Sequence, residues 1–417
     1  MFRRFVLDNG VRVVADRMPS AKSVTIGIWV NVGSRDEDTG EEGFSHFIEH
    51  MFFKGTKARS ATQISREIDS LGGEMNAYTG RETTTFYVKV LDQHLGRALA
   101  LLADVFHHSL FHAKDVEKEK QVVLEEVRMV QDDPEDLVQD LHTEQALKAH
   151  PLGRPILGKP TTIQSIRRQD LLRFIDRHYH PEETLIAVAG NFNVKELRPL
   201  LEGSFGSFTK PQRPPMNRWP SDVGNGLLVR HKRLQQAHLC LGFKGLRNDH
   251  KDRYGLYALN SLMGGSVSSR LFQEVREKRG LAYSIYSYAA SFSDTGTFTI
   301  YAATRPKQAA QVVEVVGREL RRLHRHGIGR TEIERIKEQM KGSFMLNLES
   351  TPSRMTKVAK DELYHGRYLS LNEVMAGIDA VSGSQVSRLA HELFSAESHA
   401  VTALGPISVR ELEAAID

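Results

Sequence analysis

The hydrophobic positions along the chain change their spacing repeatedly, and this predicts short strands that alternate with amphipathic helices. Near the start, Asn9-Gly10 lies between two short apolar segments, a pattern typical of a β-hairpin. Further predicted strands of the first half are residues 24–32 and 83–91. The predicted helices of this half are residues 43–53, 61–71, 94–107 and 114–130.

The second half repeats this order of elements. Its predicted strands are 237–243 and 297–303, and its predicted helices are 254–263, 270–278, 306–324 and 330–348. Between the halves, residues 211–221 are rich in proline and are predicted to form a linker. We therefore predict an α+β protein with two homologous domains, 1–210 and 222–417, each a mostly antiparallel sheet with helices packed on one face.

The composition is that of an ordinary globular protein, because 40% of the 417 residues are hydrophobic and 26% are charged. No apolar run approaches the roughly 18 residues that a membrane helix needs, and no apolar segment of the signal-peptide type follows the basic N-terminus. The net charge is only +4 and the basic residues are scattered, so neither membrane nor nucleic-acid binding is predicted. The single cysteine fits a reducing compartment, and we predict a cytoplasmic protein.

One predicted helix carries two histidines and the most informative chemistry of the sequence. Thr39 and Glu42 have the spacing of a capping box, which predicts that this helix begins just after Thr39. His46 and His50 are four residues apart, and Glu49 is three residues after His46. In a helix this spacing places the three side chains on one face.

Two imidazoles one turn apart can bind a single Zn²⁺ at roughly 2.0–2.1 Å, and a glutamate between them can take a proton from water on the metal. The order H-x-x-E-H is the inverse of the commoner zinc-peptidase motif. The alternative interpretation is a helix with two hydrogen-bonded histidines and a surface glutamate. Burying a glutamate beside two histidines without a cation is costly, which weakens that alternative.

A catalytic zinc needs a third protein ligand, and the helix predicted at 114–130 offers two carboxylates. Glu119 and Glu126 are seven residues apart, so they lie on one side of the helix. Val122 and Val123 lie between them and predict that this side faces the interior. Glu126 as a ligand with Glu119 as its supporting partner is one interpretation, and a charged helix surface is the other. The spacing alone does not decide between them.

Together, the H-x-x-E-H motif and the two glutamates resemble the metal-site pattern of the pitrilysin family, which includes insulin-degrading enzyme and mitochondrial processing peptidase. The resemblance extends over essentially the whole chain. It implies that His46, His50 and Glu126 bind one Zn²⁺ per chain, that Glu49 is the general base and that Glu119 supports the site. The length resembles that of the short members, in which two chains form a four-domain clamshell, so the resemblance also implies a homodimer.

Two further segments resemble the same family. Asn76 and Ala77 precede the strand 83–91, and in the family this edge strand takes the substrate peptide by β-addition. A sheet edge with a polar turn is the alternative. Arg276 and Tyr283 resemble the family's Arg/Tyr pair, which implies an Arg that binds a peptide carbonyl or carboxylate and a Tyr that donates to a developing oxyanion. Spacing alone leaves both as ordinary structural residues.

These observations lead to the expectation of a zinc-dependent endopeptidase that hydrolyses unstructured peptides inside a closed chamber. A second hypothesis is a non-catalytic scaffold or binding subunit of the same fold. A third is a peptidase that is active only with a different partner chain. Residues 254–263, the counterpart of the histidine helix in the second half, contain no histidine, so one zinc site per chain is predicted.

Overall fold

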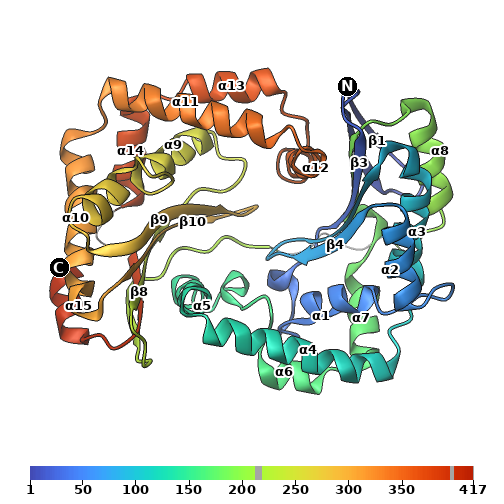
Figure 1. Cartoon of the computed structure of the whole chain (residues 1–417), viewed down its shortest axis with the longest axis horizontal. Helices are drawn as coiled ribbons and strands as arrows, with labels where there is room; N and C mark the ends of the chain where they lie inside the picture. Colours follow the sequence, from blue (N-terminus) through green and yellow to red (C-terminus); the bar gives the residue numbers. More distant parts are fainter. Residues whose placement is uncertain (212–217, 395–398, 417) are drawn as a thin grey trace. The chain divides into compact units, whose positions relative to one another are not determined.

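The chain folds into two compact units, each with its own sheet (Figure 1). The structure is a computed structural model that describes residues 1–211, 218–394 and 399–416. Unit 1 comprises Met1–Met129, Arg154–Asn217 and Met345–Leu369, and unit 2 comprises Val130–Gly153, Arg218–Phe344 and Ser370–Asp417. Each unit therefore takes most of its residues from one half of the sequence and a shorter segment from the other. Most of the predicted linker lies outside the described residues.

The sheet of unit 1 has the strand order β1-β2-β6-β3-β5-β4. Its strands are β1 Phe2–Val6, β2 Arg12–Arg17, β3 Ser23–Val30, β4 Glu74–Thr79, β5 Thr84–Leu91 and β6 Thr184–Gly190. Neighbouring strands are antiparallel except for β2 and β6, which are parallel. The predicted hairpin between β1 and β2 is confirmed, and Gly10 adopts a φ of 97° in its turn.

Helices cover both faces of this sheet. They are α1 Phe44–Phe52, α2 Ala61–Ser70, α3 Leu95–His108, α4 Ala113–Asp132, α6 Pro160–Ser165, α7 Arg168–His178, α8 Val194–Phe205 and α12 Thr351–Lys360. Ile26 and Ile28 of β3 point into a large core that α1, α3 and α8 close. Trp29 points to the opposite face, where α12 covers it and the indole Nε1 donates to Sδ of Met355 at 3.2 Å.

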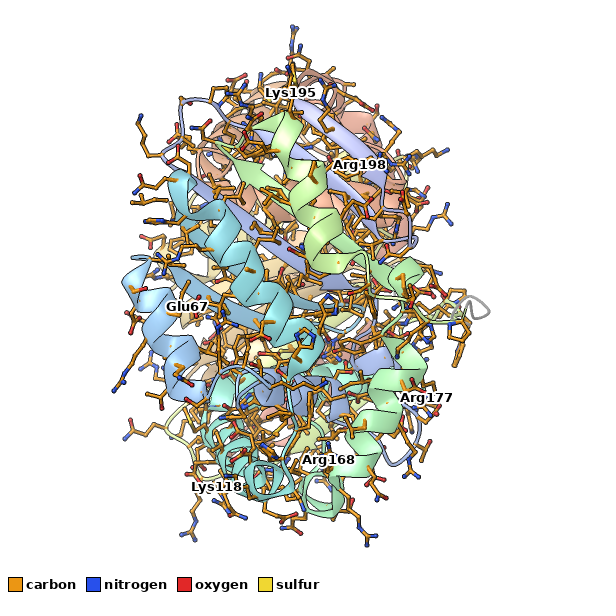
Figure 2. The ribbon with its side chains drawn as sticks, turned by 90° about the vertical axis from the view of Figure 1, so that its right-hand side faces the viewer. Glu67, Lys118, Arg168, Arg177, Lys195 and Arg198 are labelled. Carbon is orange, nitrogen blue, oxygen red and sulfur yellow. The ribbon has the colours of Figure 1, made fainter. Side chains whose placement is uncertain are left out.

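Charged side chains lie on the outer sides of these helices (Figure 2). Arg177 of α7 pairs with Glu41 at 2.5 Å, and Arg198 of α8 pairs with Asp8 at 3.3 Å. The apolar sides of α7 and α8 face the core, as amphipathic helices on a sheet require. Among the described residues, no helix combines the length and the apolar character that crossing a bilayer would require.

The sheet of unit 2 has the strand order β7-β11-β8-β10-β9. Its strands are β7 Gly226–Arg230, β8 Ala237–Lys244, β9 Ala282–Ser291, β10 Gly296–Thr304 and β11 His399–Leu404. Its helices are α5 Pro134–Ala146, α9 Arg253–Met263, α10 Ala309–His326, α11 Arg330–Asn347, α13 Leu371–Asp379, α14 Gly383–Leu393 and α15 Val409–Ile416, with a π-helix at Phe272–Glu277. The helices α9, α10 and α14 share the main core of this unit, whereas α5 packs on the other face against β8 and β11.

The two sheets have the same topology, so the predicted internal duplication is present in the fold. Replacing β2, β6, β3, β5 and β4 by β7, β11, β8, β10 and β9 reproduces the strand order of the second sheet from the first. Both sheets are mostly antiparallel, with one parallel pair each. The α+β class is thus confirmed. Beyond the helices predicted on one face, a helix also packs on the other face of each sheet, α12 in unit 1 and α5 in unit 2.

Candidate functional site

The histidine helix α1 begins later than its sequence predicts. It starts at Phe44, and Gly43 before it has a left-handed φ of 95°. The predicted capping box is therefore wrong: Glu42 instead accepts a hydrogen bond from the backbone N–H of Gly40. A glycine is needed at position 43 because a Cβ there would lie 2.7 Å from the carbonyl oxygen of Leu157, besides the cost of the left-handed conformation.

The carboxyl group of Glu37 takes over the capping of α1. Its two oxygens accept hydrogen bonds from the backbone N–H groups of Gly43 at 2.9 Å and Ser45 at 2.8 Å. Arg154 in turn donates to the backbone oxygen of Glu37. Burial raises the pKa of Glu37 to about 8, although the two backbone hydrogen bonds and the charge of Arg154 act in the opposite direction. The start of the histidine helix is thus held by a buried carboxyl group.

Three side chains converge beside α1, namely those of His46, His50 and Glu126. The Nε2 atoms of His46 and His50 are 3.2 Å apart. Oε2 of Glu126, from α4, lies 3.6 Å from the first and 3.5 Å from the second. A tetrahedral zinc with ligands at about 2.0–2.1 Å spaces its donor atoms about 3.3–3.4 Å apart, so this triangle has the size of one face of such a site.

Glu119 fixes the tautomer of His50. Its Oε1 lies 2.9 Å from Nδ1 of His50, which places a proton on Nδ1 and leaves the lone pair of Nε2 directed toward Glu126. Lys54 pairs with the other oxygen of Glu119 at 2.6 Å. Burial raises the pKa of Glu119, but the hydrogen bonds to His50 and Lys54 outweigh it and lower the pKa overall. Glu119 is consequently an anion that supports the histidine.

The two imidazoles differ in their electrostatics. Burial, together with the neighbouring His50, lowers the pKa of His46 to about 3, so this ring is neutral at physiological pH. Burial also lowers the pKa of His50, but the hydrogen bond that its Nδ1–H donates to Glu119 and the charges of Glu126 and Glu49 raise it overall. Nδ1 of His46 is buried without a partner among the described residues. A neutral ring, an oriented lone pair and a carboxylate are a donor set that fits a zinc ion.

Glu49 lies on the same helix and is held by the sheet. Its Oε2 accepts a hydrogen bond from the hydroxyl of Thr79 at 2.5 Å. Burial is the main cause that raises the pKa of Glu49, and the Thr79 hydrogen bond opposes it. A raised pKa suits a carboxylate that must accept and then release a proton near neutral pH.

Comparisons with known proteins identify the family. A family model described as "Insulinase (Peptidase family M16)" matches residues 12–160, and one described as "Peptidase M16 inactive domain" matches residues 165–340. An uncharacterized zinc protease of Bacillus subtilis, YmxG, is 44% identical over 97% of this chain and 98% of its own length. The chain belongs to peptidase family M16, the pitrilysin family.

Solved structures share the M16 fold. A protease from Helicobacter pylori superposes with a TM-score of 0.91 at 25% identity, over 97% of this chain and 99% of that chain. A chain from the structure of complex III2 of Candida albicans superposes with a TM-score of 0.85 at 21% identity, over 99% of both chains, and shares the fold. The resemblance to the pitrilysin family that the sequence suggested is thereby confirmed.

The predicted peptide-binding strand of the M16 chain is the outermost strand of its sheet. β4 pairs only with β5, so its other edge is open among the described residues. The backbone N–H of Ala77 donates at 2.8 Å to Oδ1 of Asn76, its own neighbour. Gly80 donates to the carbonyl of Thr83 across the hairpin. Because backbone groups alternate in an antiparallel ladder, Ala77 and Thr79 direct their N–H and C=O groups to the open edge.

Arg276 and Tyr283 lie side by side in unit 2. The guanidinium of Arg276, in the π-helix, is 5.3 Å from the ring centre of Tyr283 and 4.7 Å from that of Phe272. Tyr283, near the start of β9, is 77% exposed, so its hydroxyl is free of the core. This cation–π stack holds the pair together. The roles expected for both residues stay predictions.

On α4 the side between the two glutamates is only partly buried. Val123 is fully buried, as expected, but Val122 is 45% exposed, so the prediction that both valines face the interior is wrong for Val122. Glu126 keeps 35% of its side chain accessible, whereas Glu119 keeps 4%. Seven residues fall slightly short of two full helical turns, so Glu126 does not lie exactly above Glu119 on α4. It is rotated away from the core, and this explains its greater exposure.

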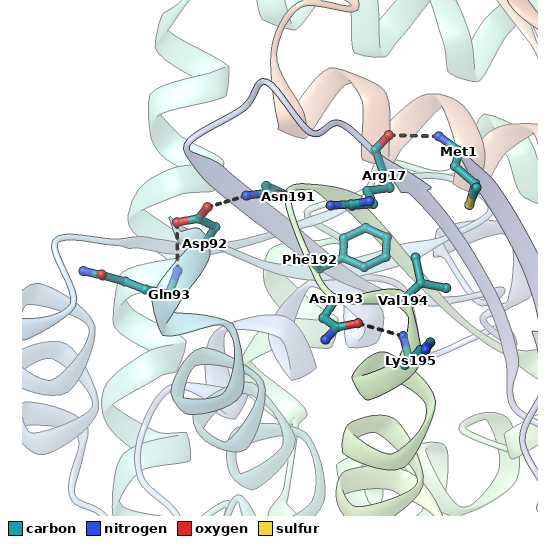
Figure 3. Close-up of a pocket in the computed structure, with 9 residues that line it drawn as sticks. All are labelled: Met1, Arg17, Asp92, Gln93, Asn191, Phe192, Asn193, Val194 and Lys195. Carbon is teal, nitrogen blue, oxygen red and sulfur yellow. Dashed lines mark hydrogen bonds between the residues drawn. The ribbon is translucent and has the colours of Figure 1, made fainter.

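A separate hollow of about 690 Å³ lies elsewhere in unit 1 (Figure 3). Asn191 bridges to Asp92 at 2.6 Å, and Asn193 caps α8 by accepting from the backbone N–H of Lys195 at 3.0 Å. None of the predicted site residues lines it. Its lining residues are Met1, Arg17, Asp92, Gln93, Asn191, Phe192, Asn193, Val194 and Lys195.

Proposed function

We propose that this M16 chain is a zinc-dependent endopeptidase that hydrolyses unstructured peptides, with one zinc ion held by His46, His50 and Glu126. The convergence of these three donor atoms beside the half-buried carboxylate of Glu49 carries the proposal. Relatives that are similar over nearly the whole chain are named zinc proteases, which supports it further.

When bound, a zinc ion supplies the Lewis acidity that polarises a peptide carbonyl and acidifies water. Glu49 accepts the proton of the attacking water and later delivers it to the leaving amine. Glu119 keeps the proton of His50 on Nδ1, so that Nε2 stays a ligand throughout. Lys54 balances the charge of Glu119 and keeps its carboxylate on His50.

A peptide adds as a further strand to the open edge of β4. The main-chain hydrogen bonds of strand addition require an extended backbone and little particular sequence, which favours unfolded substrates. Asn76 must release the N–H of Ala77 when the peptide pairs there. We assign Arg276 to a peptide carbonyl or carboxylate and Tyr283 to the developing oxyanion. A chamber formed by two copies of the chain would exclude folded proteins.

The test combines metal analysis with a fluorogenic peptide assay on the wild-type protein, Glu49→Gln and Glu125→Gln. Glu125 lies next to Glu126 but is exposed and paired with Arg128, so it is the matched control. We expect about one zinc per chain in all three proteins, and a loss of turnover of about 10²- to 10⁴-fold in Glu49→Gln only. Wild-type turnover in Glu49→Gln would refute the assignment of the base.

The two other hypotheses give different results in the same experiment. A non-catalytic scaffold would contain no stoichiometric zinc and cleave nothing. A peptidase that depends on a different partner chain would contain zinc and cleave nothing alone. The complete set of donors is the observation that favours the active enzyme over the scaffold. Light scattering of the purified protein tests the homodimer.

A further inference from the structure

The hydroxyl of Thr79 reaches the proposed base from the proposed peptide-binding strand. Thr79 is the last residue of β4, and its Oγ1 donates to Oε2 of Glu49 at 2.5 Å. Among the described residues, it is the only group that hydrogen-bonds the Glu49 carboxylate. The second oxygen of Glu49 therefore receives no hydrogen bond from the described part of the protein.

The side chain of Thr79 faces α1 because of the register of β4. Residues 74, 76 and 78 are exposed, whereas residues 75, 77 and 79 are half-buried. Met75 and Ala77 pack against the core that contains α1, so Thr79 lies on the same side as these two residues. A β-strand fixes this alternation, and the hydroxyl is consequently directed at the helix face that carries Glu49.

The backbone of the same residue faces the open edge of the sheet. Gly80 is tied to Thr83 across the hairpin, and the N–H of Ala77 bonds to Asn76 rather than to β5. The alternation of an antiparallel ladder then leaves the N–H and C=O of Thr79 available to an added strand. Thr79 thus offers its main chain to the peptide and its side chain to the base.

We propose that Thr79 is a positioning residue that holds one oxygen of Glu49 and presents the other toward His46 and His50, and that a peptide paired with β4 locks this arrangement. The proposal rests on the proposed function. An edge strand moves more freely than the strands inside a sheet. Peptide pairing restrains Thr79, and through the 2.5 Å hydrogen bond it restrains the carboxylate. The base is therefore best oriented when substrate is in place.

The experiment compares Thr79→Val, which keeps the shape, with Thr79→Ser, which keeps the hydroxyl. Thr84→Val is the matched control, because Thr84 lies directly opposite Thr79 on β5 but donates to the backbone oxygen of Val32. We expect kcat to fall about 10- to 100-fold in Thr79→Val, since misplacing a reacting group by about 1 Å costs of that order. KM should change less than about threefold, and Thr79→Ser and Thr84→Val should keep kcat within about threefold of the wild type.

Two further measurements separate positioning from folding and binding. Zinc content should be unchanged in Thr79→Val. The affinity of a labelled, unstructured peptide, measured by anisotropy in the Glu49→Gln background, should be the same with and without Thr79→Val. A Thr79→Val enzyme with wild-type kcat, or a Thr79→Ser enzyme as slow as Thr79→Val, would overturn the role of Thr79 alone. Turnover in Glu49→Gln would instead overturn the proposed function together with it.

Discussion

The buried carboxyl group at the start of α1 predicts an unusual pH dependence of stability. Glu37 is 3% exposed and bonds two backbone N–H groups of the helix start. Glu37→Gln keeps the shape of the side chain and one acceptor oxygen, but it cannot ionise. Its NH2 group faces one of the two backbone N–H donors, so two donors meet without an acceptor. The variant therefore isolates the titration of Glu37 from the rest of the protein.

The size of the effect follows from the pKa. Burial raises the pKa of Glu37 from an ordinary 4.5 to about 8 in the folded protein. The neutral form is thus favoured by folding, so its contribution is complete below pH 4.5 and is lost as the pH rises through 8. Each pH unit of this interval corresponds to about 1.4 kcal/mol, which sets a ceiling of roughly 5 kcal/mol. In Glu37→Gln, the backbone N–H group that faces the new NH2 group loses its acceptor, and this lowers the free energy of unfolding by about 1–3 kcal/mol at every pH.

The assay is thermal unfolding of wild type and Glu37→Gln between pH 5 and pH 8, with chelator present so that metal release does not contribute. In a unit of this size, 1 kcal/mol moves the Tm by about 2–4 °C. The wild type should melt several degrees above the variant at pH 5, and this advantage should shrink steadily and vanish or reverse by pH 8. Glu125→Gln should follow the wild type throughout.

Two curves that run parallel from pH 5 to pH 8 would refute this reasoning. They would mean that the hydrogen bonds from Gly43 and Ser45, with the charge of Arg154, keep Glu37 ionised in spite of its burial. A change of zinc content in Glu37→Gln at pH 7 would show in addition that the capped start of α1 positions His46 and His50.

The remaining predictions concern the residues that support the proposed zinc site and the helix α1 that carries it. Glu119→Gln should lower zinc affinity about 10- to 100-fold, because the partner that orients His50 is weakened, and competition with a chelator measures this; an affinity equal to that of Glu125→Gln would contradict it. Gly43→Ala should lower the stability by at least about 1–3 kcal/mol, measured as a fall in Tm, because of its φ of 95° and the close carbonyl of Leu157. Gly96→Ala, in open space on α3, is its control and should leave the Tm unchanged or slightly raised.

The sequence alone indicated the proposed zinc ligands but not all of the groups that position them. His46 and His50 are visible because helical spacing relates them, whereas the spacing of Glu119 and Glu126 left their role open and only the family resemblance singled out Glu126. Glu37 and Thr79 act on α1 from a loop and from a strand, and no fixed spacing connects either of them to a histidine. Lys54 lies close to His50 in the sequence, yet only the fold brings Glu119 to it. Such partners depend on how separate elements pack.

The strands and helices that were not predicted have equally specific reasons. β6 is a short, wholly apolar run, Leu185–Ala189 with small flanking residues, and a run of this kind does not distinguish a strand from a buried helix. It is apolar on both faces because α12 covers the face away from α1. No feature of the sequence around residue 185 indicates that Met355 and its helix α12 will pack on this strand. The helix boundary at Phe44 was missed because the carboxyl group of Glu37, which lies six residues before Gly43, caps the helix and the predicted local box does not.

The contact between Trp29 and Met355 joins residues separated by 326 positions. During synthesis, one apolar face of the sheet of unit 1 therefore stays uncovered until α12 has left the ribosome. A fragment that ends near residue 210 would expose Trp29 and Ala187 to solvent, however complete its metal donors were. The residues of the proposed zinc site are therefore synthesised before the helix that covers the far face of their sheet, and that covering depends on the last part of translation.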